Sequence, residues 1–392
     1  MNKMFTDTID IKSVFWLFSA FSFILGSCIG SFMNVVVWRL PRGESLLYPP
    51  SHCPKCGHAI RPWENIPIIS WLCLKARCSN CHLPISIKYP LGEGATGLLF
   101  AFLWMRIFQR GLPLECIPTF FFLGGALLAA ALIDAEHRFI PDQVTYSGIL
   151  FALLMAIVLP SGRLALLPQP NPHAGTLIFT GVKTMLLNWR FDLTPHPLTT
   201  ALIDCTLGAA MGYAILALFA WSTRRLFGNV SKSFRKPVPA TITKEGIRLH
   251  NTFRAWEDVL DSIGDTLIIH GTLPSEKNIA KITANAKGFS IDGKSSPWEA
   301  TSKKEIKIER IATTRDVIGY GDVKLLAMIG AFLGADATIY ILLTAALLAI
   351  FYAIASMLFH RRFIPSLPFG PFLAIATLLW MLFGNIAFLI LS

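Results

Sequence analysis

Long apolar runs constrain this chain more than any other feature of its sequence. A helix needs about 20 apolar residues to cross the roughly 30 Å hydrocarbon core of a bilayer. Of the 392 residues, 53% are hydrophobic and only 15% are charged, and eight runs come near that length. They cover 14–38, 94–112, 117–135, 143–160, 199–221, 323–337, 339–359 and 370–391. The sequence therefore predicts an all-α polytopic membrane protein with about eight transmembrane helices.

The formal net charge of +11 is concentrated in a few loops. Lys and Arg are numerous after the first, fifth and seventh runs, and such loops are usually cytoplasmic. This places both chain termini outside and argues against nucleic acid as the reason for the charge. Arg106 and Arg110 fall on the outer side and count against this topology. The loop cations are Arg39, Arg42, Lys55, Arg61, Lys75, Arg77, Lys88, Arg224, Arg225, Lys232, Arg235, Lys236, Arg361 and Arg362.

The first apolar run could instead be a secretion signal, because "LGSC" (25–28) resembles a lipoprotein cleavage site. The run nevertheless continues to Trp38, and the basic "RLPR" follows it as at a stop-transfer boundary. We therefore expect residues 1–38 to be the first transmembrane helix.

Four cysteines in residues 39–92 form two CxxC motifs, "CPKC" and "CSNC". They are Cys53, Cys56, Cys78 and Cys81. Two such motifs at this separation can supply four thiolates to a tetrahedral zinc ion. Disulfides or idle thiols are the alternatives, and disulfides are rare on the reducing cytoplasmic side. Cys73 is a fifth thiol nearby that could replace one of the four ligands. The sequence predicts a cytoplasmic zinc-ribbon-like domain whose metal is structural, because four cysteines leave no open coordination position.

A second polar segment, residues 229–316, lies between the fifth and sixth runs. Alternating patterns between turn residues predict a few short strands, and "FRAWEDVLDSI" (253–263) predicts one amphipathic helix. We expect a small cytoplasmic α+β insert with an interaction or regulatory role. The rest of the chain divides into predicted transmembrane helices and one loop. Transmembrane helices 2–4, which carry Asp134, cover 93–160; an outer loop covers 161–198; transmembrane helix 5 covers 199–228; and transmembrane helices 6–8 with the GxGD motif cover 317–392.

Two acids at the cytoplasmic ends of apolar runs are the candidate catalytic residues. Asp134 ends the third run and Asp322, in "GYGD", begins the sixth, so the predicted topology puts both near the same membrane face. Two nearby carboxylates in a low-dielectric site share protons and can activate a water molecule. The alternative is that both acids cap helices; that suits Asp322 at a helix N-terminus but does not suit Asp134.

Other acids and one lysine near these runs have different expected roles. Asp142 is expected to cap the fourth run, and Glu136 to be solvated. Glu93, which begins the second run on the cytoplasmic side, is the one further acid that could reach the site. Lys324 is expected to snorkel to the surface or to modulate the acid pair. The glycines before Asp322, Gly319 and Gly321, could let a substrate backbone approach closely.

Six segments in this order resemble the prepilin peptidase family, the type IV leader peptidases. They are "GSFMNVVVWRLPRGES", "CPKC…CSNC", "YPLGEGATGLLF", "IDAEHRFIPDQVT", "GYGDVKLLAMIGAFLG" and "PFGPFLAIATLLW". The resemblance implies a GxGD intramembrane aspartic protease of the inner membrane that cuts basic leaders from prepilins and pseudopilins. It places the catalytic aspartates on Asp134 and Asp322 and matches Glu93 to an acidic position of the family.

The resemblance also implies that the chain serves a type IV pilus or a type II secretion system, and that it methylates the new N-terminus with S-adenosylmethionine. No nucleotide-binding glycine motif supports that cofactor independently. The insert at 229–316 and the loop at 161–198 look longer than in the family. A proton-coupled transporter and a non-catalytic assembly scaffold are the alternative functions. The expected partners are prepilin-like precursors and the lipid bilayer, and the sequence does not indicate an oligomeric state.

Overall fold

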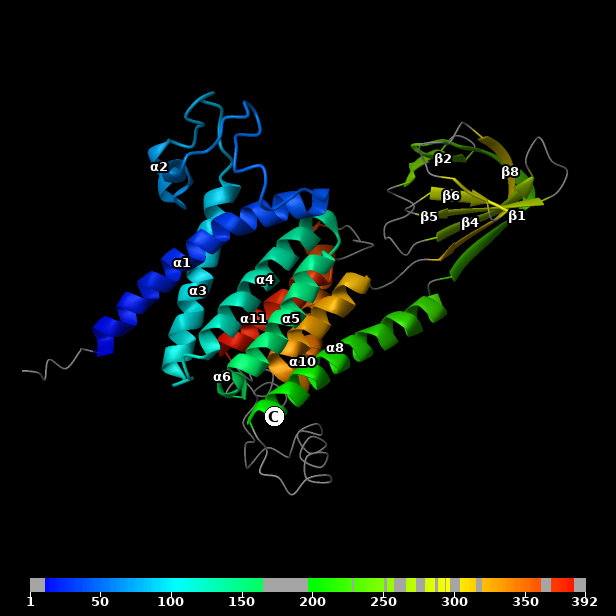
Figure 1. Ribbon diagram of the computed structural model, residues 1–392. Helices are drawn as coiled ribbons and strands as arrows, with labels where there is room; N and C mark the ends of the chain where they lie inside the picture. The colour runs from blue at the N-terminus through cyan, green and yellow to red at the C-terminus, as the bar shows by residue number, and fades with distance from the viewer. Residues whose placement is uncertain are drawn as a thin grey trace, which may run out of the picture. The chain divides into compact units, whose positions relative to one another are not determined.

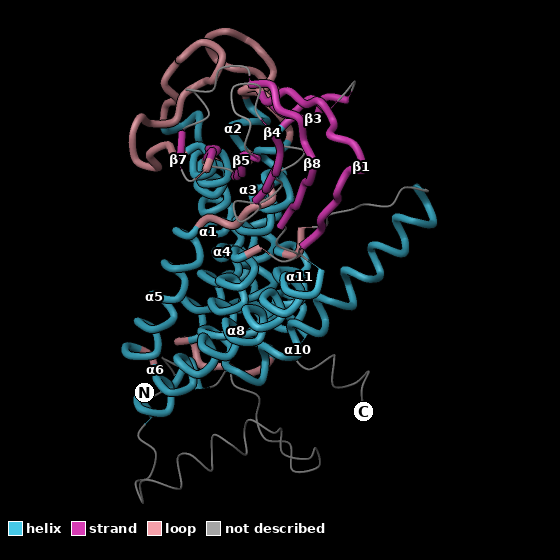
Figure 2. Tube along the Cα trace, turned by 90° about the vertical axis from the view of Figure 1, so that its right-hand side faces the viewer, coloured by secondary structure: helices cyan, strands magenta, loops and turns pink. Residues whose placement is uncertain are grey.

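The computed structural model describes residues 11–164, 197–227, 229–249, 252–256, 266–272, 279–285, 288–292, 294–296, 304–314, 319–360 and 368–383. The chain divides into two compact units. The first, Met1–Ala214 with Gly321–Ser392, holds most of the helices, and the second, Ile215–Tyr320, holds a β-sheet (Figures 1 and 2). Each unit is described separately below.

Five of the described helices are long and apolar enough to cross a membrane. They are α1 (Ile11–Arg39), α3 (Lys88–Gln109), α4 (Cys116–His137), α8 (Pro197–Phe227) and α10 (Tyr320–His360). Two shorter apolar helices, α5 (Asp142–Val158) and α11 (Gly370–Phe383), accompany them, and α6 (Pro160–Leu164) follows α5. The structure thus confirms a mostly helical protein with membrane-length helices.

The count of eight spans stays a prediction. Helix α10 takes the place of the sixth and seventh predicted spans, and Gly334 interrupts it with backbone angles φ 84° and ψ 172°. Those angles lie outside the helical region, so α10 consists of two helical segments joined at this glycine. Most of the predicted outer loop, from 165 to 196, lies outside the described residues.

Helix α4 and the first half of α10 are the most buried parts of the helical unit. Their fully buried side chains include Leu123, Leu127, Ile133, Leu325, Met328 and Phe332. Helix α8 packs closely on α10 through small residues, because a Cβ on Gly208 would lie 2.1 Å from the carbonyl oxygen of Gly330. The two candidate acids, Asp134 and Asp322, therefore sit at the ends of the two innermost helices.

The segment between α1 and α3 belongs to the predicted domain 39–92, which we call the ribbon domain. It contains two short 3₁₀ helices, η1 (Leu40–Arg42) and η2 (Pro62–Asn65), and the short helix α2 (Ile69–Cys73). Between residues 40 and 92 only Cys78 is buried. This domain accordingly has no hydrophobic core of its own. Helices α1 and α3, which flank it, pack side by side (Figure 1).

The second unit is built around an eight-stranded antiparallel sheet with strand order β3-β2-β1-β8-β4-β5-β6-β7. The strands are β1 (Asn229–Ile242), β2 (Gly246–Leu249), β3 (Thr252–Ala255), β4 (Thr266–Thr272), β5 (Ile279–Asn285), β6 (Gly288–Ile291), β7 (Lys294–Ser296) and β8 (Lys304–Thr314). Apolar and polar side chains alternate along the strands, and the apolar ones form one core. In β8, for example, Ile306 and Ile308 are buried while Lys307 between them is exposed.

Two details of the predicted insert were wrong. It contains eight strands, one of them 14 residues long, where a few short strands were expected. The expected helix at 253–263 does not begin at Phe253, because Phe253–Ala255 belong to strand β3 and pair with β2; Trp256, the next residue, is helical. Hydrogen bonding to a neighbouring strand there overrides the helical spacing of the apolar residues. Residues 257–263 lie outside the described part of the chain.

Candidate active site and cysteine cluster

Asp134 lies in the last turn of α4 and is 6% exposed. Its Oδ2 atom accepts a hydrogen bond from the backbone N–H of Gly370, the first residue of α11, at 3.0 Å. A Cβ at position 370 would lie 2.7 Å from that oxygen, which is closer than non-bonded atoms approach. Only glycine at position 370 allows this contact without a shift of either group.

Asp322 lies in the first turn of α10 and is 9% exposed. The residue before it, Gly321, rests against Ile140: a Cβ there would lie 3.1 Å from the Ile140 Cβ. The other side of Ile140 contacts the start of α11, because its Cδ1 is 3.0 Å from where a Cβ of Gly370 would be.

Ile140 thus lies between Gly321, which precedes Asp322, and Gly370, whose N–H is hydrogen-bonded to Asp134. We call Ile140 in this position the wedge. The end of α4 and the starts of α10 and α11 converge on this wedge. Both predicted acids are therefore buried at helix ends that meet at Ile140. Gly319, the other candidate glycine, is partly buried just before α10.

Lys324 forms an ion pair with Asp142, the first residue of α5, and its Nζ atom lies 2.6 Å from Asp142 Oδ1. The same ammonium lies 5.3 Å from the centre of the Tyr146 ring. The prediction that Asp142 caps α5 was wrong, because Pro141 occupies the cap position and makes no side-chain cap bond. Asp142 instead joins α5 to α10 beside the Ile140 wedge, where its charge also suits the helix N-terminus.

Glu93 is buried at the second turn of α3 and binds the ribbon domain. Its Oε2 atom accepts the backbone N–H of Ile68 at 2.7 Å. Ile68 has φ 63° and ψ −50°, and the N–H of Ile69 donates to the carbonyl of Pro67 at 2.6 Å. This is a γ-turn, a strained conformation that β-branched residues rarely adopt. Glu93 therefore anchors a strained turn, a contact that no sequence pattern indicated.

Glu93 and Asp134 lie toward the same end of the helical unit. Helices α3 and α4 run antiparallel: the Phe100 and Phe121 rings are 4.3 Å apart, and Lys88 forms an ion pair with Glu136 at 3.9 Å. Lys88 and Glu136 are exposed, as was predicted for Glu136. The ribbon domain is thus attached beside the end of the bundle that holds the candidate acids.

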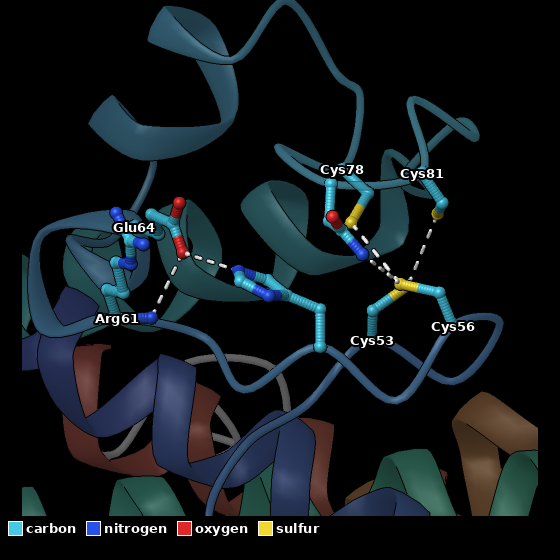
Figure 3. Close-up of polar contacts among 8 residues, drawn as sticks. Cys53, Cys56, Arg61, Glu64, Cys78 and Cys81 are labelled. Carbon is cyan, nitrogen blue, oxygen red and sulfur yellow. Dashed lines mark hydrogen bonds and ion pairs between the residues drawn. The ribbon is translucent and has the colours of Figure 1, made fainter.

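The four predicted cysteines form one cluster in which all sulfur atoms lie within 4.8 Å of one another (Figure 3). The Cys53–Cys81 and Cys56–Cys78 sulfur pairs are 3.9 and 4.0 Å apart. Four sulfurs at about 2.3 Å from a tetrahedral zinc ion would be about 3.8 Å apart, so the cluster fits such an ion. Cys73 is exposed and does not belong to the cluster.

The two CxxC motifs have the same local structure. The N–H of Cys53 donates to His58 O and that of Cys78 donates to Leu83 O, which is the equivalent residue 25 positions later. Gly57 and His82, each following the second cysteine of its motif, both have left-handed backbone angles. Such turns point backbone N–H groups at the sulfur atoms that they surround.

These N–H groups stabilise thiolates. The backbone N–H of His58 lowers the pKa of Cys56 to about 7, and the N–H groups of Cys81 and Asn80 lower the pKa of Cys78. The N–H of Leu83 acts in the same direction on Cys81, but burial and the neighbouring sulfurs outweigh it and raise the pKa of Cys81 to about 11. The cluster thus combines two thiols of lowered pKa with one of raised pKa, which a metal ion would have to deprotonate.

Comparison with known families matches two parts of the chain. A model described as the Bacterial Peptidase A24 N-terminal domain matches residues 24–107, and one described as the Type IV leader peptidase family matches residues 289–354. The first match contains the cysteine cluster and Glu93, and the second contains Asp322. Asp134 lies between the two matched segments.

Three curated relatives illustrate the extent of the similarity. The prepilin leader peptidase/N-methyltransferase of Myxococcus xanthus (strain DK1622) is 46% identical over 143 residues, which are 36% of this chain and 42% of the relative. The type 4 prepilin-like proteins leader peptide-processing enzyme of Escherichia coli O78:H11 is 40% identical over 206 residues, 48% of this chain and 73% of the relative. The Aeromonas hydrophila prepilin leader peptidase/N-methyltransferase is 26% identical over 400 residues, 94% of this chain and 92% of the relative.

Several matches, including the one to Myxococcus xanthus, span less than half of the relative's own length. No solved structure matches the chain. The similarity to the Escherichia coli enzyme, which covers most of that protein, agrees with the two family matches. The chain belongs to the type IV leader peptidase family.

Proposed function

We propose that this protein is a membrane-embedded aspartic endopeptidase that removes the basic leader from type IV prepilin-like or pseudopilin precursors. The observation that carries the proposal is that Asp134 and Asp322 are buried at the ends of the two innermost helices, and that these ends meet at Ile140. The relatives are named for leader-peptide processing, which supports the same substrate class.

The chemistry follows from two acids that share one proton. The ionised acid takes a proton from a water molecule, and the water oxygen attacks the scissile carbonyl carbon. The protonated acid donates its proton to the carbonyl oxygen. Collapse of the tetrahedral intermediate then breaks the C–N bond: the amine leaves with the proton that came from water, and one hydroxyl of the intermediate returns its proton to the second acid as the C=O bond re-forms. The close packing at Gly321 and Gly370 fixes the carboxylates for these transfers.

The placement of the site in the cell is part of this proposal. The basic loops put the ribbon domain, the sheet and both acids on the cytoplasmic side of the inner membrane. Counting α5, α11 and the two segments of α10 as separate crossings gives eight spans. A substrate helix would enter the bundle from the bilayer and present its leader junction at the cytoplasmic boundary.

The cofactors are a structural zinc ion and S-adenosylmethionine. Cys53, Cys56, Cys78 and Cys81 would hold the zinc ion, and with four sulfur ligands it would have no open position for catalysis. S-adenosylmethionine would supply a methyl group to the new α-amino nitrogen. We assign no described residue to it, so the methylation proposal rests on the names of the relatives.

Incubation of the purified protein with a prepilin peptide and S-adenosylmethionine tests both activities. Mass spectrometry should show the mature peptide without its leader, and a fraction of that peptide should carry one additional methyl group. A peptide that loses its leader but never gains a methyl group would refute the transferase while keeping the protease. An intact peptide, with zinc present and the protein folded, would refute the proposed function.

The Gly370→Ala variant tests the geometry around Asp134. The added methyl group would lie 2.7 Å from the Asp134 carboxylate, so the carboxylate must move. We expect leader cleavage to slow by about 10- to 100-fold, measured as kcat on a prepilin peptide, because a shift of about 1 Å misaligns a catalytic group. Gly125→Ala in α4 is the matched control, since its new methyl group would make only an ordinary 3.6 Å contact with Met33. Equal rates for both variants would contradict the role of the Gly370 contact.

A further inference from the structure

The ribbon domain carries four exposed apolar side chains within and between η2 and α2. Trp63, Ile66, Ile69 and Leu72 are 63, 44, 57 and 61% exposed and follow one another at intervals of three residues. We call these four residues the apolar stripe. Single exposed apolar residues are common, but four within one short segment mark an interaction surface.

Hydrogen bonds hold the same segment in place, two of them within the ribbon domain and one to helix α3. The Trp71 indole N–H donates to the carbonyl of Ile85 at 3.2 Å, and Glu64 accepts the N–H of Arg61 at 3.0 Å (Figure 3). The N–H of Ile68 binds the buried carboxylate of Glu93. The γ-turn at Ile68 separates the first two residues of the stripe from the last two. It thus sets the orientation of Ile66 relative to Ile69.

The stripe lies next to a membrane-length helix. Glu93 is at the second turn of α3, and the Cδ1 of Ile68 is 3.8 Å from where a Cβ on Gly94 would be. The outward side of α3 carries Leu91 and Leu98, which are 61 and 52% exposed and suited to lipid. The exposed apolar surface of a candidate span therefore begins where the ribbon domain is attached.

Charge decides which partner fits the stripe. The ribbon domain, residues 39–92, contains seven lysines and arginines against two glutamates. A basic leader peptide, the substrate class proposed above, would be repelled by this charge, whereas anionic lipid headgroups would be attracted. An apolar row that includes a tryptophan and has basic residues around it is typical of segments that lie in the membrane interface.

We propose that the apolar stripe is a membrane-surface anchor that embeds in the anionic leaflet beside α3. Glu93 is its positioning residue, because its carboxylate ties the turn between Ile66 and Ile69 to the span. The anchor and the zinc cluster together orient the ribbon domain on the membrane. This role is independent of peptide cleavage and would exist in a protein whose protease activity was lost.

Photocrosslinking of the full-length protein tests the anchor. A benzophenone amino acid replaces Ile69 or, separately, Leu72, and the purified protein is irradiated in nanodiscs made with phosphatidylcholine and about one-third phosphatidylglycerol. The matched control places the same amino acid at Lys55, an exposed residue of the first CxxC motif that is not on the stripe. Bound zinc, measured for each variant, verifies that the ribbon domain is folded.

We expect intact-protein mass spectra to show phospholipid adducts at positions 69 and 72 and none at 55. The adduct yield should fall several-fold in nanodiscs of phosphatidylcholine alone, since the electrostatic part of the attraction is then absent. Crosslinks to another part of this chain or to an added prepilin peptide, or the absence of any lipid adduct, would overturn the proposal.

Two substitutions of Glu93 test its positioning role in the same assay. Glu93→Gln retains an oxygen that accepts the Ile68 N–H, so the lipid adduct at position 69 should persist. Glu93→Ala removes the acceptor, so the adduct yield should drop while bound zinc stays unchanged. Equal yields for the two variants would show that Glu93 does not hold the stripe at the membrane.

Discussion

Asp134→Asn and Asp322→Asn should each reduce cleavage of a prepilin peptide by about 10³-fold or more, because an amide can neither take nor give the proton that the reaction transfers. Both variants should still fold. In Asp134→Asn the new amide oxygen can accept the Gly370 N–H as the carboxylate does, and a neutral amide is less costly than an acid at the end of a membrane helix. Initial rates of leader loss, followed by mass spectrometry at saturating peptide, measure the effect.

The matched control for this experiment is Glu136→Gln. Glu136 lies two residues after Asp134 on the same helix, but its side chain is 58% exposed and pairs with Lys88 across 3.9 Å. An exposed ion pair contributes little to stability, so we expect activity within about twofold of the unmodified protein. Substantial turnover by both single aspartate variants would eliminate the paired-acid mechanism. Loss of activity in Glu136→Gln as well would mean that the cleavage assay reports a general electrostatic effect.

The features that were predictable from sequence are those that local physics determines. Apolar runs located α1, α3, α4 and α8 because lipid requires a long apolar helix whatever its neighbours are. The spacing of the two CxxC motifs located the cysteine cluster, since each motif forms its own tight turn and supplies two sulfurs. In both cases the residues that carry the signal are close together in the chain.

The contacts that shape the candidate site were not predictable in this way. The N–H of Gly370 reaches Asp134 across 236 positions of the sequence, and Lys324 reaches Asp142 across 182. Neither pair has a local pattern, so Asp142 was interpreted as a simple cap. Glu93 was predicted as an acid that could reach the site, and its partner in the structure is a backbone N–H, which every residue except proline has. Only the folded structure identifies such partners.

Removal of the metal should have the largest effect on stability. In the Cys78→Ser variant, bound zinc should fall from about one ion per chain to nearly none, and the ribbon domain should become sensitive to limited proteolysis. Cys78 is the only buried residue between positions 40 and 92, and it is itself a member of the cluster. Without the metal no hydrophobic core remains to hold this domain, and zinc binding in comparable small domains contributes about 10–16 kcal/mol.

Cys73→Ser is the control for the metal experiment, because Cys73 is an exposed thiol of the same domain outside the cluster. Its bound zinc and its proteolysis pattern should match those of the unmodified protein. Treatment of the unmodified protein with a chelator should reproduce the Cys78→Ser cleavage pattern, and α4 and α10 should stay protected, since their buried side chains do not depend on the ribbon domain. A ribbon domain that resists protease after its zinc has been removed would mean that the attachment through Glu93 is sufficient to hold it, and the structural role of the metal would be refuted.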